Sequence, residues 1–159
     1  MEMHNTIQAL GDSISLGYGL ENVDHSYVSI LQRHLETEID VYAECGRNVQ
    51  DLIRILPAIV SHKYTISIVF IGTNGTFSAD EYSYLISTLK KNSERVIACT
   101  LPVLSDKNRV ISDVAGKTNV ELCDINKHWD KVFFLKDGVH PNCLGHEYIA
   151  KALLDIINN

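Results

Sequence analysis

The sequence predicts an α/β sandwich built on a mostly parallel sheet. Short apolar runs of strand length alternate five times with longer segments whose apolar residues recur at helical spacing, and parallel strands need such crossover connections. No repeat, low-complexity block or Pro/Gly/Ser-rich linker interrupts the 159 residues. A chain of this length buries roughly 70% of the surface that its unfolded form exposes, so it can form a core without disulfides or metal ions. We therefore expect a single domain over residues 1–159.

The first half of the chain predicts two strand and helix pairs. An apolar run at 6–10 is followed by a helical pattern at 26–38, and a second run at 40–45 is followed by a helical pattern at 48–64. Pro57 lies inside the second helical pattern, where a proline removes a backbone donor, so we expect a kink or a break there.

The second half continues the alternation and closes on a helix. Residues 65–72 are nearly all apolar, with several β-branched side chains, which is typical of a strand covered on both faces. The next segment opens with Ser78 and two acidic residues and ends in two lysines, as a helix dipole favours. Asn142 is the expected cap of the last helix. The predicted elements are a strand at 65–72, a helix at 78–92, a strand at 95–102, a short helix at 106–116, a strand at 120–125 and a helix at 143–159.

Charge and hydropathy patterning argue against several partners. Fourteen basic and twenty acidic residues give a net charge of -6, and the basic residues are scattered along the chain, so binding to a phosphate backbone is not expected. No run approaches the ~18 apolar residues of a membrane span. The start carries Glu2 and no basic stretch leading into an apolar block. We expect no nucleic-acid partner, no membrane span and a cytoplasmic location.

The four cysteines do not form a metal or redox motif. Cys45, Cys99, Cys123 and Cys143 include no CxxC pair and no adjoining histidine cluster. We expect no metal site, and we expect Cys45 and Cys99, in their apolar runs, to be small buried hydrophobic residues.

Polar residues cluster where the predicted strands end. "GDS" at 11–13 follows the first strand, "CGRN" at 45–48 the second and "GTNG" at 72–75 the third, while "KDGVHPN" at 136–142 precedes the last helix. Turn chemistry alone could explain each segment, because glycine tolerates positive φ and Asn and Asp bond their own backbone. Parallel sheets carry their sites at the carboxyl ends of strands. The four segments together, in this order, therefore favour a functional site.

These residue types suit nucleophilic catalysis. The Ser13 hydroxyl can attack a carbonyl only if a base takes its proton, and His140 is the histidine with a carboxylate, Asp137, three residues upstream in a turn-rich segment. A tetrahedral oxyanion also needs hydrogen-bond donors. The candidates are the backbone N–H of Ser13, the N–H of Gly46 and the side-chain amide of Asn74.

The four blocks together resemble the SGNH hydrolases, also called GDSL-type esterases and lipases. The resemblance implies Ser13 as nucleophile, His140 as general base and then acid, and Asp137 as the partner that orients the imidazole. It implies an oxyanion hole formed by Gly46, Asn74 and the Ser13 amide. It also implies a flavodoxin-like three-layer α/β/α sandwich with five parallel strands, and no metal or organic cofactor. The opening block would be a strand-to-helix elbow, in which Asp12 fixes the turn.

The sequence specifies the substrate class less closely than the catalytic residues. The leading hypothesis is a serine esterase that hydrolyses small-molecule carboxylic esters or thioesters with small acyl groups, through an acyl-enzyme. "GTNG" is reminiscent of SGNH domains that transfer or remove acetyl groups on glycans, so such an enzyme is one alternative and a non-catalytic ligand-binding module is another. An FMN-binding or phosphorelay protein would share the fold, but the chain lacks a hydroxyl-rich phosphate loop and an acidic cluster.

One departure from the family pattern concerns the third block. Many relatives carry an acidic residue directly after its asparagine, whereas this chain has Gly75, so the usual bracing of that loop is not expected here. His146 is expected on the surface or at the rim of the substrate site. Adjacency alone nominates the substrate-contacting residues, with Arg47 able to steer an anionic group: Ile14, Arg47, Thr73, Phe77 and Val139.

Overall fold

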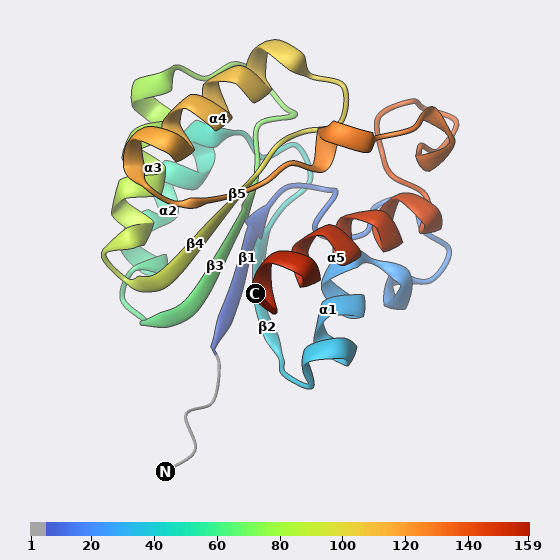
Figure 1. The fold of residues 1–159 in the computed structure, drawn as a ribbon, viewed down its shortest axis with the longest axis horizontal. Helices are drawn as coiled ribbons and strands as arrows, with labels where there is room; N and C mark the ends of the chain where they lie inside the picture. The colour runs from blue at the N-terminus through green and yellow to red at the C-terminus, as the bar shows by residue number, and fades with distance from the viewer. Residues whose placement is uncertain (1–5) are drawn as a thin grey trace.

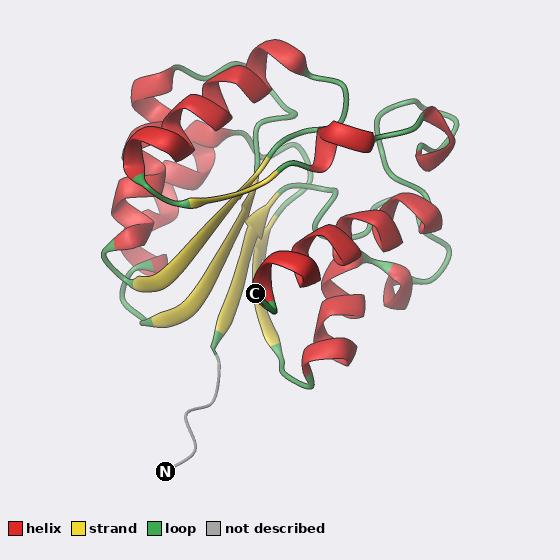
Figure 2. Cartoon of the chain, viewed as in Figure 1, coloured by secondary structure: helices red, strands yellow, loops and turns green. Residues whose placement is uncertain are grey.

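The computed structural model describes residues 6–159 and contains one five-stranded sheet. All four strand pairs are parallel, and the order β2-β1-β3-β4-β5 is that of flavodoxin-like folds (Figures 1 and 2). The predicted fold class is therefore confirmed. The strands are β1 (Ile7–Gly11), β2 (Ile39–Ala43), β3 (Tyr64–Phe70), β4 (Ser93–Cys99) and β5 (Glu121–Cys123).

Helices cover both faces of the sheet. Figure 1 shows α1 and α5 packed side by side on one face and α2, α3 and α4 on the other, which makes the three predicted layers. Short 3-10 turns fill the connections before α1 and α5. The helices are η1 (Val23–His25), α1 (Tyr27–Leu35), α2 (Val49–Ile59), α3 (Ala79–Lys90), α4 (Ser105–Thr118), η2 (Ile125–His128), η3 (Lys131–Phe133) and α5 (Cys143–Ile157).

Local sequence signals explain where the helices begin. Asn48 and Ser78 each form a capping box with the acidic residue three positions later, at the starts of α2 and α3. The Asn142 side chain accepts a hydrogen bond from the Gly145 N–H at 3.0 Å, so it caps α5 as predicted. Each such cap stabilises a helix by about 1 kcal/mol, because it satisfies a backbone donor that the helix leaves free.

The core lies on both faces of the central strands. All five residues of β1 and six of the seven in β3 are buried, as an apolar strand between two helical layers should be. One polar pair crosses this core, because Gln8 Nε2 donates to Ser67 Oγ at 2.7 Å. The edge strand β2 is largely open to solvent.

Two local expectations need adjustment. The helix expected to extend to residue 64 ends at Ile59, with Pro57 in its last turn, where the missing proline donor removes one of the final helical bonds. Cys45 is exposed, contrary to the prediction, because β2 ends at Ala43 and the chain turns outward at the open edge of the sheet. Cys99, on the inner strand β4, is buried as predicted.

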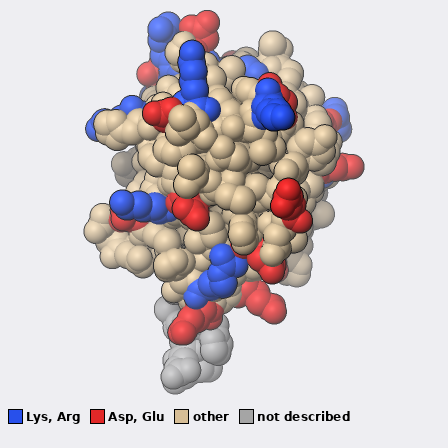
Figure 3. Space-filling view, turned by 90° about the vertical axis from the view of Figure 1, so that its right-hand side faces the viewer, with Lys and Arg blue, Asp and Glu red and all other residues tan. Residues whose placement is uncertain are grey.

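The surface carries charges of both signs. On the face in Figure 3, acidic and basic side chains are interspersed among uncharged ones, and neither sign forms a continuous stripe. Within residues 6–159, no helix has the length and apolar character needed to cross a membrane.

Candidate active site

The nucleophile candidate follows β1 at the topological switch point of the sheet. β1 lies between β2 and β3, with Gly11 opposite the last residue of each, and ligands of such sheets bind where the strand order reverses. Asp12 is fully buried, and its Oδ1 accepts a hydrogen bond from the Ile14 N–H at 2.9 Å. Asp12 therefore holds the turn around Ser13, as predicted.

The chain after this turn does not enter a helix directly. Residues 12–19 form successive turns, and α1 begins only at Tyr27. The Tyr18 N–H donates to the Ser13 carbonyl at 3.0 Å. Gly17 has a left-handed backbone conformation, with φ 76°, which glycine adopts with little strain. The expected strand-to-helix elbow is thus a strand followed by a compact loop, which is itself hydrogen-bonded around the serine.

The three side chains predicted to act together form a chain of hydrogen-bond contacts. The Ser13 hydroxyl lies 3.0 Å from His140 Nε2, and His140 Nδ1 lies 2.5 Å from Asp137 Oδ2. The carboxylate can only accept, so Nδ1 carries the proton and Nε2 is the acceptor for the serine hydroxyl. This tautomer leaves the imidazole ready to remove the Ser13 proton.

The Asp137 loop fixes its own geometry. Asp137 Oδ1 accepts hydrogen bonds from the backbone N–H groups of His140 and Val139, both at 2.9 Å. These backbone bonds, first that of His140 and then that of Val139, together with the imidazole bond, lower the pKa of Asp137 to about 2. The carboxylate is therefore ionised at neutral pH. A bond from the Leu135 N–H to the His140 carbonyl at 2.8 Å closes the loop.

The two other predicted oxyanion donors lie on the loops that flank Ser13. The Asn74 side-chain amide donates to the Arg47 carbonyl at 3.1 Å, which ties the loop after β3 to the loop after β2. An amide carries two N–H donors, so the second remains for another acceptor. Gly46, next to Arg47, has φ 79° and an exposed backbone.

A cavity of about 270 Å³ adjoins these residues. Ile14, Thr73 and Val139, three of the nominated contact residues, line it. Arg47 does not, and its guanidinium instead pairs with Glu44 Oε2 at 3.1 Å. Phe77 also lies outside this lining and packs on the ring of a buried tyrosine of α3. The full lining is Ile14, Thr73, Asn74, Pro102, Val103, Leu104, Phe134, Gly138 and Val139.

Two residues at the site were not found by sequence reasoning. The Tyr18 ring lies 4.5 Å from the His140 ring, centroid to centroid, and restricts how the imidazole can turn. Val103 has φ 55°, a left-handed conformation that is rare for a β-branched residue. Tyr18 was visible as part of the first block, but nothing in its spacing indicated contact with His140.

His146 is not at the surface or at the rim of the substrate site, contrary to the prediction. Its side chain is fully buried, and Nδ1 accepts a hydrogen bond from the Tyr27 N–H at 3.0 Å. The two rings also stack, with centroids 6.1 Å apart. The residue faces the sheet because it lies on the inner side of α5, and its burial lowers its pKa to about 4. His146 is therefore a neutral residue of the core.

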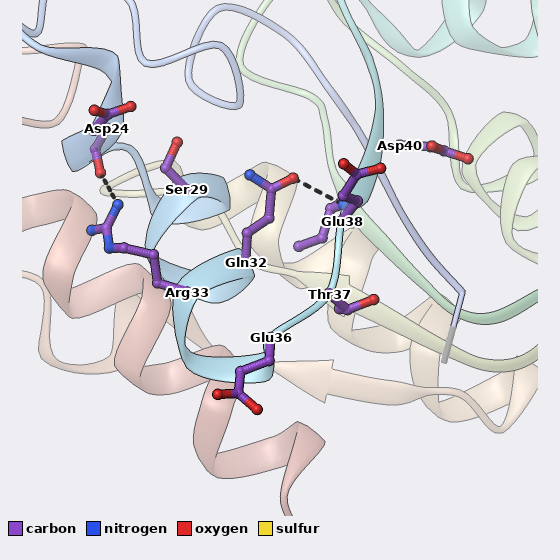
Figure 4. A pocket seen from close by; sticks show the side chains of 9 residues that line it. Asp24, Ser29, Gln32, Arg33, Glu36, Thr37, Glu38 and Asp40 are labelled. Carbon is purple, nitrogen blue, oxygen red and sulfur yellow. Dashed lines mark hydrogen bonds between the residues drawn. The ribbon is translucent and has the colours of Figure 1, made fainter. Parts of the chain in front are cut away.

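A larger cavity, about 670 Å³, lies near the opposite edge of the sheet (Figure 4). Its lining comes from η1, α1, the loop that follows α1 and the start of β2, where Ile39 is paired with the first residue of β1. Gln32 Oε1 accepts from the Ile39 N–H at 2.9 Å, and Arg33 donates to the Asp24 carbonyl at 2.7 Å. These bonds join α1 to its neighbours.

Within residues 6–159, no group of three or more His, Cys, Asp or Glu side chains could hold a metal ion.

Comparison with known proteins identifies the family. A model of the GDSL-like lipase/acylhydrolase family matches residues 9–148. The chain belongs to this family. Members of the GDSL-like lipase/acylhydrolase family are ester-hydrolysing enzymes, so this chain is a hydrolase of that type. A search of curated protein sequences finds no match.

Solved structures share the fold at low identity. An α/β hydrolase from the metagenome of Lake Arreo, Spain, is 21% identical, with a TM-score of 0.77 over 97% of this chain and 95% of its own. A lipase/acylhydrolase from Enterococcus faecalis is 19% identical, with a TM-score of 0.78 over 97% and 95%. A family two carbohydrate esterase from Clostridium thermocellum, as an active-site mutant, is 18% identical, with a TM-score of 0.84 over 100% of this chain and 64% of its own.

Proposed function

We propose that the chain is a serine esterase that hydrolyses carboxylic esters or thioesters with small acyl groups through an acyl-enzyme on Ser13. The observation that carries this proposal is a pair of consecutive short contacts. Ser13 Oγ lies 3.0 Å from His140 Nε2, and His140 Nδ1 lies 2.5 Å from Asp137 Oδ2. A nucleophile within reach of a base that is itself oriented by a third group is the arrangement that covalent catalysis requires.

In the first half of the reaction, Ser13 is acylated. His140 Nε2 takes the hydroxyl proton while Oγ bonds to the carbonyl carbon of the ester, and the carbonyl oxygen becomes an oxyanion. Asp137, ionised because its pKa is near 2, stabilises the imidazolium that forms. The imidazolium then protonates the leaving alcohol or thiol as its bond to the acyl carbon breaks, which leaves the acyl group on Ser13.

In the second half, water replaces the alcohol. His140 removes a proton from the water as its oxygen bonds to the acyl carbon, and the same proton returns to Ser13 Oγ when the acid leaves. In both halves the Ser13 N–H, the Gly46 N–H and the second N–H of the Asn74 amide are the proposed donors to the oxyanion. Each such donor is worth about 10²–10³ in rate.

The dimensions and character of the neighbouring cavity support small acyl groups. Its volume of about 270 Å³ lies below the roughly 300–1,000 Å³ that accommodates drug-sized ligands. Ile14, Val103 and Val139 give it apolar walls, and the last two are among the exposed hydrophobic side chains of the protein. An apolar wall favours the hydrocarbon part of an acyl group over a charged one.

The first experiment tests whether Ser13 is the nucleophile. We expect the protein to hydrolyse p-nitrophenyl acetate and Ser13→Ala to lose this activity by on the order of 10⁴-fold or more. Ser61→Ala is the matched control, because Ser61 is exposed and its hydroxyl donates to the carbonyl of Ala58 in its own turn. A fluorophosphonate probe should label the wild-type protein and the control but not Ser13→Ala. Equal rates for Ser13→Ala and wild type would refute the proposal.

A glycan deacetylase or acetyltransferase is the second candidate. The carbohydrate esterase with a TM-score of 0.84 supports it, as does the exposure of the site, since the Asp137 side chain is 41% exposed. A panel of acetylated sugars, short-chain p-nitrophenyl esters and acyl-CoA thioesters, with product analysis in the presence of an added alcohol, separates these activities. Highest kcat/KM on acetylated sugars would favour the second candidate.

A further inference from the structure

The loop between Gly72 and Thr76 carries Asn74 and has no regular secondary structure. Two of its glycines, Gly72 and Gly75, have φ 131° and 66°, so the backbone follows a path that other residues rarely adopt. A loop of this kind holds a side chain in one place only if other groups fix its backbone. Gly75 directly follows this asparagine, so no side chain at that position can fix the loop.

A lysine from another layer of the fold holds this loop. Lys107, in the first turn of α4, places its Nζ 2.7 Å from the Gly72 carbonyl oxygen, 3.1 Å from that of Thr73 and 2.7 Å from that of Gly75. An ammonium group has three donors, and all three are directed to the loop that carries Asn74. Bonds from a charged donor are roughly twice as strong as neutral ones.

The position of Lys107 is unfavourable for an ordinary surface lysine. A positive charge in the first turn of a helix is opposed by the helix dipole, and Lys107 is partly buried. Its burial lowers its pKa below that of a free lysine. None of the ion pairs in the described part of the chain includes Lys107, so the three loop carbonyls are what compensate its charge.

The helix that carries Lys107 is itself anchored. The neighbouring Asn108 is buried, its Oδ1 accepts from the Leu101 N–H at 2.6 Å, and its Nδ2 donates to the Leu101 carbonyl at 2.7 Å. This pair of bonds ties the start of α4 to the segment just after β4. Lys107 therefore extends from a rigid support rather than from a free helix end.

The opposite side of the Asn74 loop is also tied down. Asn74 Nδ2 donates to the Arg47 carbonyl at 3.1 Å, and Gln50 Nε2 donates to the Thr76 carbonyl at 2.8 Å. These two bonds connect the loop to the region around Gly46. Lys107 holds three other carbonyls of the loop, those of Gly72, Thr73 and Gly75.

We propose that Lys107 is a positioning residue, which holds the loop through three backbone carbonyls and keeps the Asn74 amide directed at the oxyanion. This inference rests on the proposed function, because it assigns Lys107 a role in the same acyl transfer. Lys107 does not contact the substrate. It acts through the loop backbone, so its effect should appear only when the Asn74 amide is present.

The test is Lys107→Met, which keeps the aliphatic stem and removes the three donors. With p-nitrophenyl acetate we expect kcat to fall 10- to 100-fold and KM to stay within about 2-fold, because an oxyanion donor acts in the transition state and not in the substrate complex. Lys117→Met is the matched control on the exposed end of the same helix, and we expect it to keep the wild-type kcat.

A double-mutant cycle distinguishes positioning from general loosening. In the Asn74→Ala background, Lys107→Met should lower kcat by less than about 3-fold, because the amide that it positions is already gone. If Lys107→Met does not fold, as judged by its far-UV circular dichroism, Lys107→Gln takes its place in the same cycle with an expected intermediate loss. Wild-type kcat in the folded variant, or the full loss in the Asn74→Ala background, would overturn the inference.

These outcomes are separable from failure of the proposed function. Ser13→Ala with wild-type activity refutes the esterase mechanism itself. Activity that depends on Ser13 but is unaffected by Lys107→Met leaves the esterase intact and removes only the positioning role.

Discussion

Acid should destabilise this protein through one buried histidine. His146 is fully buried and accepts a hydrogen bond from the Tyr27 N–H at Nδ1, so a proton on that nitrogen would break the bond and place a charge in the core. Burial lowers the pKa of His146 from 6.5 to about 4 in the folded protein. In the unfolded chain the imidazole takes a proton near pH 6.5.

The sign and size of the effect follow from this difference. Between pH 6.5 and pH 4 the unfolded state binds more protons at this site, so stability is fully present above pH 6.5 and is lost as the pH falls toward 4. A shift from 6.5 to about 4, at roughly 1.4 kcal/mol per pKa unit, corresponds to a loss of roughly 3 kcal/mol by pH 4. Against a typical total of about 5–15 kcal/mol, this loss is large.

The assay compares wild type with His146→Gln, whose amide oxygen can accept the Tyr27 bond but does not titrate. Urea unfolding, followed through Trp129 fluorescence, gives the free energy of unfolding of each protein at pH values from 4.5 to 7.5. Asp12, whose burial raises its pKa, contributes to the pH dependence with the opposite sign, but it is common to both proteins. The difference between the two is therefore due to His146.

We expect the advantage of wild type over His146→Gln to shrink steadily as the pH falls below 6.5. His62→Gln, at an exposed position, is the control for removing an imidazole outside the core, and its difference from wild type is measured over the same pH range. A constant difference between wild type and His146→Gln over the whole range would refute the reasoning, because it would mean that His146 binds protons equally in both states.

Three further outcomes are expected. Asp137→Asn should lower kcat for p-nitrophenyl acetate on the order of 10⁴-fold, since the amide favours the wrong imidazole tautomer, and a loss below 10-fold would contradict its role. Asn74→Ala should lower kcat about 10²–10³-fold with little change in KM, and an equal rise in KM would indicate ground-state binding instead. Gly11→Ala should lower the melting temperature, because its Cβ would collide with the Ser15 hydroxyl and lie 2.9 Å from the Phe70 carbonyl oxygen; an unchanged melting temperature would show that the turn can relax.

The fold was predictable because its signals are local and repeated. Apolar runs such as 65–72 indicated strands by composition alone, and caps such as Ser78 indicated where helices begin. The flavodoxin-like sandwich of five parallel strands came from the family resemblance, and the strand order β2-β1-β3-β4-β5 came from the structure. The helix ends were less predictable. Pro57 lies within the last turn of α2 and the helix ends two residues later, at Ile59, whereas the apolar spacing had suggested a helix to residue 64.

Side-chain burial was harder to infer from spacing. His146 lies on a helix next to a polar block, which suggested exposure, but the inner face of α5 packs on the sheet and on Tyr27. Cys45 extends an apolar run, which suggested burial, but it lies beyond the end of an edge strand. In both cases the decisive fact is which neighbour the element packs against, and no single-sequence pattern carries it.

The same distinction between local and distant contacts applies to the candidate active site. The Ser13 turn is held by Asp12 through the Ile14 N–H, and the His140 imidazole by a carboxylate three residues away, so short segments of sequence contain both arrangements. The Asn74 amide is different, because its loop is held by groups from α4 and from the start of α2, 26 to 35 residues away. The shape of this loop therefore depends on side chains from other elements of the fold, which the four residues of its own block do not reveal.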